Sequence, residues 1–317
     1  IIGGLALAGG ACMHAPETTE GPTSTTTGSQ GGATGTGGSS GGSTATGGAA
    51  TGTPAGTPAG TPAGTPTGSG GGGLVSTQLV DTGLITRYFI DERADGQGNA
   101  ELVDSAPNPL NLQINWLADL NYTESADGNR GLNWTVVGGD SGATVPVAAT
   151  KVSQGLHGST TGTIEVVVEI AEVSTSHSRI SHIGYDQDSG SFTLSAPSTT
   201  RLNFYSGSLR GLWEVDFVTL GRVVLHLVYD TDQADPEDRS KLYIDGALQP
   251  RLGGTVAPQG ALIDVGTNEH YCLGNRYVGD RSFIGTLYYS AMYSEPLTEA
   301  EVHQNVAVLL VDDDAPQ

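Results

Sequence analysis

Residues 161–170, which read TGTIEVVVEI, decide the fold class of this 317-residue chain. Apolar and mixed positions alternate along them with a period of two, which is typical of a β-strand with one buried face. The buried face would carry Ile164, Val166, Val168 and Ile170, and the opposite face Glu165, Val167 and Glu169. Similar runs occur at residues 84–90, 180–185, 191–194, 202–205, 222–229, 241–245 and 283–293. This many short strands predicts an all-β protein built as an antiparallel two-sheet sandwich.

Turns and one helix complete the predicted domain, which we place at residues 81–311. Asp245-Gly246 favours the positive φ values of a tight hairpin turn. Thr298 and Glu301 form a capping box that starts a short C-terminal helix. An apolar stripe follows on this helix at Val302, Val306, Leu309 and Leu310. We expect residues 312–317 to form a solvated acidic tail. Residues 111–116 and 132–136 stay open between strands and ordered loops.

The first 80 residues have a different composition from the rest of the chain. They hold half of its 48 Gly, no Lys or Arg, and no aromatic residue. Such a segment cannot bury enough apolar area to offset the entropy lost on ordering. We therefore predict a disordered linker at residues 13–80, with TPAG repeats at residues 53–64. The repeat has a period of four, which excludes collagen because the triple helix needs Gly at every third position.

The N-terminal residues 1–12 form an apolar, small and uncharged stretch that ends at Cys12. It is too short to span a bilayer, and it suits the apolar part of an export signal. It resembles a bacterial lipoprotein signal, in which the cysteine is lipidated; the alternative is a plain signal peptide with an incidental cysteine. We therefore expect an exported protein that is lipid-anchored through Cys12 at the bacterial outer membrane or cell surface, or is otherwise secreted.

Charge and cysteine content exclude several classes of partner and structure. The formal net charge is −21, and nearly all of it belongs to the domain after residue 80. Such an acidic surface argues against binding to nucleic acid, and limits membrane contact to the lipid anchor. Cys12 and Cys272 are the two cysteines, so the domain has no partner for an internal disulfide. We expect Cys272 to be a small buried residue.

Six segments of the domain resemble, in order and spacing, the laminin-G-like members of the concanavalin A-like lectin/glucanase superfamily. They are GLITRYFIDE (83–92), TGTIEVVVEI (161–170), GRVVLHLVYD with KLYIDG (221–246), LGNRY (273–277), FIGTLYYSAMYS (283–294) and PLTEAEV (296–302). The resemblance implies a jelly-roll sandwich. Members of this superfamily bind sugars, proteins or calcium, and some are enzymes, so the fold does not define one function.

One strand carries a candidate pair of catalytic carboxylates. Glu165 and Glu169 resemble the Glu-x-Asp-x-Glu strand of laminarinase- and lichenase-type glucanases. That resemblance implies Glu165 as nucleophile and Glu169 as acid/base of a retaining hydrolase. The middle Asp of the motif is Val167 here, which removes the group expected to polarise the nucleophile. The alternative, which we favour, is that the two acids keep an exposed strand face soluble.

Two acidic loops are candidates for calcium. Asp186 and Asp188 precede Gly190 and provide oxygen ligands two residues apart, and Asp232 lies in an acidic stretch at residues 230–238. Calcium needs six to eight oxygen ligands, and hairpin turns also favour Asp and Gly, so ordinary turns are the alternative. The histidines do not have the spacing of a zinc site. We expect His182 to be buried and His226 to face away from the core.

The favoured function is non-catalytic binding of a carbohydrate or a cell-surface protein, without a cofactor. Exposed Trp or Tyr side chains stack on sugars in lectin-like sandwiches, whereas Trp116, Trp134 and Trp213 are more commonly buried in such a core. The alternatives are a glycoside hydrolase using Glu165 and Glu169, and a structural envelope lipoprotein without a specific ligand.

Overall fold

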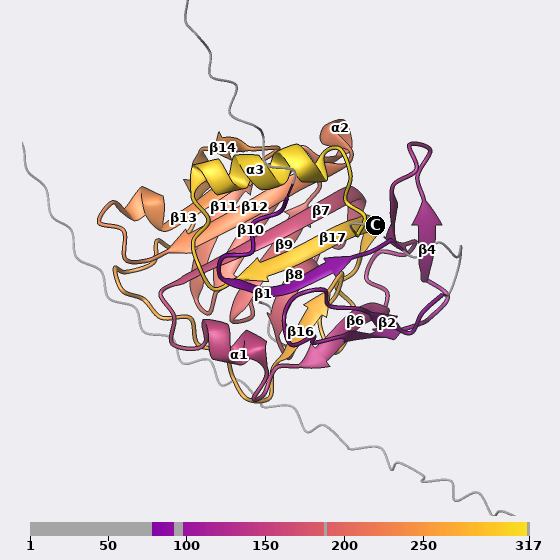
Figure 1. Ribbon diagram of the computed structural model, residues 1–317, viewed down its shortest axis with the longest axis horizontal. Helices are drawn as coiled ribbons and strands as arrows, with labels where there is room; N and C mark the ends of the chain where they lie inside the picture. The colour runs from indigo at the N-terminus through magenta and orange to yellow at the C-terminus, as the bar shows by residue number, and fades with distance from the viewer. Residues whose placement is uncertain (1–77, 92–97, 187–188, 316–317) are drawn as a thin grey trace, which may run out of the picture. The chain divides into compact units, whose positions relative to one another are not determined.

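The computed structural model describes residues 78–91, 98–186 and 189–315, which form one β-sandwich (Figure 1). The predicted signal segment, Cys12 and nearly all of the predicted linker lie outside these residues. In the described ranges, no helix is both long enough and apolar enough to cross a membrane.

Two antiparallel sheets build the sandwich, as the sequence predicts. Sheet A has the order β14-β13-β12-β7-β17-β5-β4, with β1 beside β17, and sheet B has the order β15-β11-β10-β9-β8-β16-β6-β3-β2. The strands of sheet A are β1 (Leu84–Phe89), β4 (Leu120–Glu124), β5 (Arg130–Trp134), β7 (Thr161–Val173), β12 (Val223–Asp230), β13 (Ser240–Ile244), β14 (Ala247–Gln249) and β17 (Phe283–Tyr293). Those of sheet B are β2 (Glu101–Leu102), β3 (Leu112–Asn115), β6 (Gly142–Pro146), β8 (Ser178–Gly184), β9 (Phe192–Ser198), β10 (Arg201–Ser206), β11 (Leu209–Glu214), β15 (Arg251–Gly253) and β16 (His270–Leu273).

Short helical segments connect or cover the strands. They are α1 (Lys151–Leu156), α2 (Phe217–Leu220), the 3-10 helix η1 (Pro236–Arg239) and α3 (Glu299–Leu309). The two segments that the sequence leaves open contain strands β3 and β5. The predicted tight turn joins β13 to β14, with φ values of 48° at Asp245 and 84° at Gly246.

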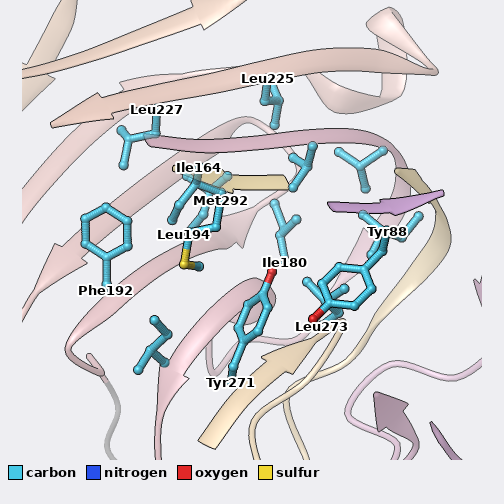
Figure 2. Packing of buried hydrophobic residues seen from close by; sticks show 14 of the residues in the cluster. Tyr88, Ile164, Ile180, Phe192, Leu194, Leu225, Leu227, Tyr271, Leu273 and Met292 are labelled. Carbon is cyan, nitrogen blue, oxygen red and sulfur yellow. The ribbon is translucent and has the colours of Figure 1, made fainter. Parts of the chain in front are cut away.

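The core lies between the two sheets and uses the predicted face of β7 (Figure 2). Ile164 and its partners at alternate positions are buried there, opposite Phe192 and Leu194 of β9 and Tyr271 of β16. Trp134 and Trp213 are fully buried, which confirms the structural interpretation of these two residues. The period-two pattern therefore correctly assigns the inner face of the sheet.

A second apolar cluster forms where α3 packs on the outer face of sheet A (Figure 1). Val302, Val306 and Leu309 of the helix are buried against residues of β7, β12 and β17. The capping box is confirmed: the Glu301 backbone N–H donates to the Thr298 hydroxyl, and the Thr298 N–H donates to the Glu301 carboxylate at 2.8 Å. Leu310 departs from the predicted stripe, because it follows the last helical residue and is 46 % exposed.

The ends of the described domain differ from the sequence prediction. Val80, which the prediction places in the linker, is buried against α3, and its backbone N–H donates to the Asn305 side chain at 2.8 Å. Asp313, which the prediction places in a solvated tail, is buried and pairs with Arg222 at 2.5 Å. Both corrections have one kind of cause: residues distant in the sequence, Asn305 of α3 and Arg222 before β12, supply polar partners that the local sequence does not reveal.

Candidate functional site

Glu165 lies on the outer face of sheet A, beneath α3, and has no exposed surface. Its Oε1 is 2.7 Å from Nε2 of His226, which occupies the paired position on β12. Its Oε2 accepts hydrogen bonds from the hydroxyls of Tyr293 at 2.7 Å and Tyr289 at 3.1 Å. The carboxylate is therefore fully engaged by structural partners.

These partners keep Glu165 ionised although it is buried. Burial by itself would raise the pKa of this carboxyl, but His226 and the donated hydrogen bonds hold the pKa below its ordinary value of 4.5. Arg87 of β1 extends the cluster, since its Nε donates to the Tyr289 hydroxyl at 3.1 Å and another of its nitrogens donates to the Val80 carbonyl at 2.6 Å. The cluster thus joins sheet A, α3 and the start of the described domain.

The two candidate catalytic carboxylates have very different environments. Glu169 is exposed and accepts a hydrogen bond from the Tyr288 hydroxyl at 3.0 Å. Glu165 is enclosed, so a glycosidic bond cannot reach it in this structure. The expectation that both acids face solvent is wrong for Glu165, because α3 covers its end of the strand. The strand period places the two carboxylates on one face, but it does not bring them together at an open site.

The candidate calcium ligands have ordinary protein partners where they are described. The Asp186 carbonyl accepts a hydrogen bond from Arg276, and Asp188 lies outside the described residues. The Asp232 carboxylate accepts from the Thr160 hydroxyl at 2.7 Å. Asp186 follows a strand of sheet B and Asp232 a strand of sheet A. Across the described ranges, no three His, Cys, Asp or Glu side chains form a group that could hold a metal ion. Calcium binding at these loops stays a prediction.

The outer face of sheet B carries the other two residues that we expected to be buried. Cys272 of β16 is buried, and burial raises the pKa of its thiol to about 12, so it is unreactive at neutral pH. His182 of β8 is paired with it across the strands, and its Nδ1 lies 2.8 Å from the Thr193 hydroxyl. Burial, together with the charges of Arg179 and Arg276, lowers the pKa of His182 from 6.5 to about 3. His182 is therefore neutral at physiological pH.

A cluster of three rings lies at one end of the same face, and we call Tyr185, His270 and Tyr277 the aromatic platform. The Tyr277 ring stacks on His270, with centroids 3.6 Å apart and planes inclined by 13°. The Tyr185 ring lies 5.3 Å from Tyr277 and 6.1 Å from His270. Tyr185 and Tyr277 are 38 % and 43 % exposed, which is unusual for large aromatic side chains in a sandwich.

Local structure holds the platform in place. Tyr185 directly follows β8, His270 begins β16, and these two strands are paired in the sheet. Tyr277 is next to Arg276, whose guanidinium donates to the carbonyls of Asp186 and Gly279 and pairs with Asp280 at 2.9 Å. Because these bonds tie the loop after β16 to the end of β8, the rings are ordered before any ligand arrives.

Sequence reasoning did not identify the platform. Tyr185 was counted as the end of a strand, and Tyr277 as part of the segment LGNRY. The three residues are far apart in the sequence, and only the pairing of β8 with β16 brings them together. An available signal was the position of Tyr185 just after a strand and of Tyr277 in a loop, both next to acidic, Gly-containing segments. Trp116, the third tryptophan, is partly buried and packs edge-on against Tyr122.

Residues 137–303 match the laminin G type family model of the concanavalin A-like lectin/glucanases superfamily. The chain belongs to this family. No match was found among curated protein sequences.

Three solved structures are similar to this chain. A Trypanosoma rangeli sialidase in complex with 2,3-difluorosialic acid is 17 % identical, with a TM-score of 0.50; the match covers 74 % of this chain and 34 % of the sialidase. Domain 4 of AbnA, a GH43 arabinanase of Geobacillus stearothermophilus in complex with arabinotriose, is 19 % identical, with a TM-score of 0.48, over 72 % of this chain and all of that one. Botulinum neurotoxin type C is 10 % identical, with a TM-score of 0.49, over 72 % of this chain and 51 % of the toxin. This chain spans about one third of the sialidase, and identities this low show the fold alone.

Proposed function

We propose that this domain binds carbohydrate without transforming it, and that the aromatic platform is the binding site. The observation that carries the proposal is the exposure of two ordered tyrosine rings on an otherwise polar sheet face. The C–H groups on one side of a sugar ring pack well on such aromatic faces, and a preordered platform loses little entropy on binding. Family membership supports this proposal, because sugar binding is common among members of the superfamily.

The environment of Glu165 supports a binding role over catalysis. A retaining hydrolase needs two carboxyls about 5–5.5 Å apart, both in contact with the substrate. Glu165 is buried under α3 and held by His226 and two tyrosine hydroxyls, so it has no free surface for a sugar. Glu169 alone does not provide the second group.

A glycan array followed by calorimetric titration of the best oligosaccharide tests the site. We expect Tyr277→Ala to weaken binding at least tenfold, because it removes the larger exposed ring face. Tyr277→Phe is the matched control and should bind like the wild type, since it keeps the ring. Leu248→Ala, at another exposed position, should also have no effect. Binding that is unchanged in Tyr277→Ala would contradict the assignment of the platform.

We also propose that the domain acts outside the cell, on a tether that starts at Cys12. The support is in the sequence alone: a short apolar stretch before Cys12, followed by an uncharged Gly-, Thr- and Ser-rich segment. Mass spectrometry of the mature N-terminus tests this. A lipid-modified Cys12 is expected, and an unmodified terminus at another residue would contradict the anchor.

A further inference from the structure

Arg210 is a second unusual residue on the outer face of sheet B. It lies on β11, and its guanidinium sits over the Tyr205 ring, 5.8 Å from the centroid. One of its nitrogens donates to the Asn203 side chain at 3.1 Å, and Asn203 in turn donates to the Tyr205 hydroxyl. The three side chains form a small polar cluster that orients the guanidinium.

The positive charge of this cluster is not balanced by a carboxylate. Within the described part of the chain, Arg210 forms no ion pair, and its Nε has no hydrogen-bond partner. Arg251 of β15 donates to the Arg210 backbone carbonyl at 2.8 Å, and its own Nη1 also lacks a partner. Burial lowers the pKa of Arg251, and Glu237 does not offset this effect. Arg210 is therefore a cation without a paired carboxylate in a protein of net charge −21.

Strand register relates Arg210 to the aromatic platform. His182, Thr193, Tyr205 and Arg210 are paired in turn across β8, β9, β10 and β11. Three strand spacings separate β8 from β11, so His182 and Arg210, the two ends of this row, are about 14 Å apart. Tyr185 lies three residues beyond His182, which places it about 17 Å from Arg210. The turn at Gly190 packs closely over His182, because a Cβ atom added at Gly190 would lie only 2.6 Å from the His182 ring. A ligand would therefore contact Arg210 at one end of the row and the platform beyond its other end.

We propose that the platform and Arg210 together bind an acidic oligosaccharide. One sugar ring stacks on the platform, and a carboxylate further along the ligand pairs with the Arg210 guanidinium. Guanidinium groups form strong two-bonded pairs with carboxylates, especially where no other anion competes. The separation of about 17 Å between Tyr185 and Arg210 fits an oligosaccharide and not a single sugar. This inference rests on the proposed function and adds to it the charge of the ligand.

The test uses carboxylated oligosaccharides, each compared with its neutral methyl ester. Oligogalacturonates and sialylated oligosaccharides of three to six units serve as probes, and calorimetry gives the affinities. The wild type should bind the acid at least tenfold more tightly than the ester, and the difference should shrink as salt is added. Arg210→Met should abolish this preference while leaving ester binding unchanged. Arg210→Lys should keep part of it, because the charge remains.

Arg201→Met is the matched control. Arg201 is an exposed arginine on β10, on the same face as Arg210, and Glu214 is its cross-strand neighbour. This variant should keep the preference, and thermal unfolding should show that all variants are folded. Equal binding of acid and ester, with binding still lost in Tyr277→Ala, would overturn the inference and leave the proposed function intact. An acid preference that survives in Arg210→Met would also overturn it. Failure to bind any oligosaccharide would overturn both.

Discussion

The outer faces of the two sheets are covered to different extents. On sheet A, α3 covers the polar residues of β7 and β12, and Glu165 and His226 become a buried pair without access to solvent. On sheet B, the turn at Gly190 covers only part of the polar face, including His182, and Tyr185 and Tyr277 stay exposed at its edge. Strand alternation produces both faces in the same way. What packs over a face decides whether its polar residues stabilise the fold or are free to meet a ligand.

Truncation of the covered carboxylate, Glu165, should have the largest effect. Glu165→Ala should lower the free energy of unfolding by about 3–5 kcal/mol, because it leaves His226 and two tyrosine hydroxyls buried without their partner. Chemical denaturation measures this change. Glu169→Ala, on the same strand and face but exposed, should change it by less than about 1 kcal/mol. Similar losses for the two variants would show that α3 does not enclose Glu165.

A second prediction concerns His182, the buried histidine on the face of sheet B. Because its pKa is lowered to about 3 in the folded protein, the unfolded chain takes up a proton below pH 6.5 and the folded one does not. Stability should therefore fall with acidification, by up to about 1.4 kcal/mol for each pH unit and by about 2 kcal/mol between pH 6.5 and 4.5. His270, whose pKa burial also lowers, adds a smaller part.

Denaturation at several pH values compares the wild type with His182→Asn, which keeps a polar group near Thr193. The slope between pH 6.5 and 4.5 should become flatter in the variant. Titration of Glu165 does not contribute between pH 6.5 and 4.5. Its lowered pKa gives stability that is present above pH 4.5 and is lost only at lower pH. An unchanged slope in His182→Asn would mean that His182 is protonated in the folded protein.

The sequence predicts the inner faces of the strands better than it predicts the outer ones. The period of β7 correctly assigns Ile164 and Val166 to the core, and the capping box at Thr298 correctly starts α3. The same period places Glu165 on the outer face, but it contains no information on what covers that face. The cover comes from α3, more than a hundred residues later in the chain.

The candidate site was beyond sequence reasoning for a related reason. The pairing of β8 with β16 brings together Tyr185, His270 and Tyr277. Strand register across β8 to β11 places Arg210 on the same face of the sheet as His182. Hydrophobic periodicity identifies strands, but it does not specify which strands become neighbours. The family resemblance implies a sandwich, and the residues of the platform are not part of the pattern that carries this resemblance.

The central claim is that ligand meets the face of sheet B and not the covered face of sheet A. Nuclear magnetic resonance of the isotope-labelled protein, titrated with the oligosaccharide that binds best on the array, tests this most directly. Signals of Tyr185, His270 and Tyr277 should shift on binding, while those of Glu165, His226 and the residues of α3 should not. Shifts concentrated at Glu165 and α3, with an unchanged platform, would contradict it.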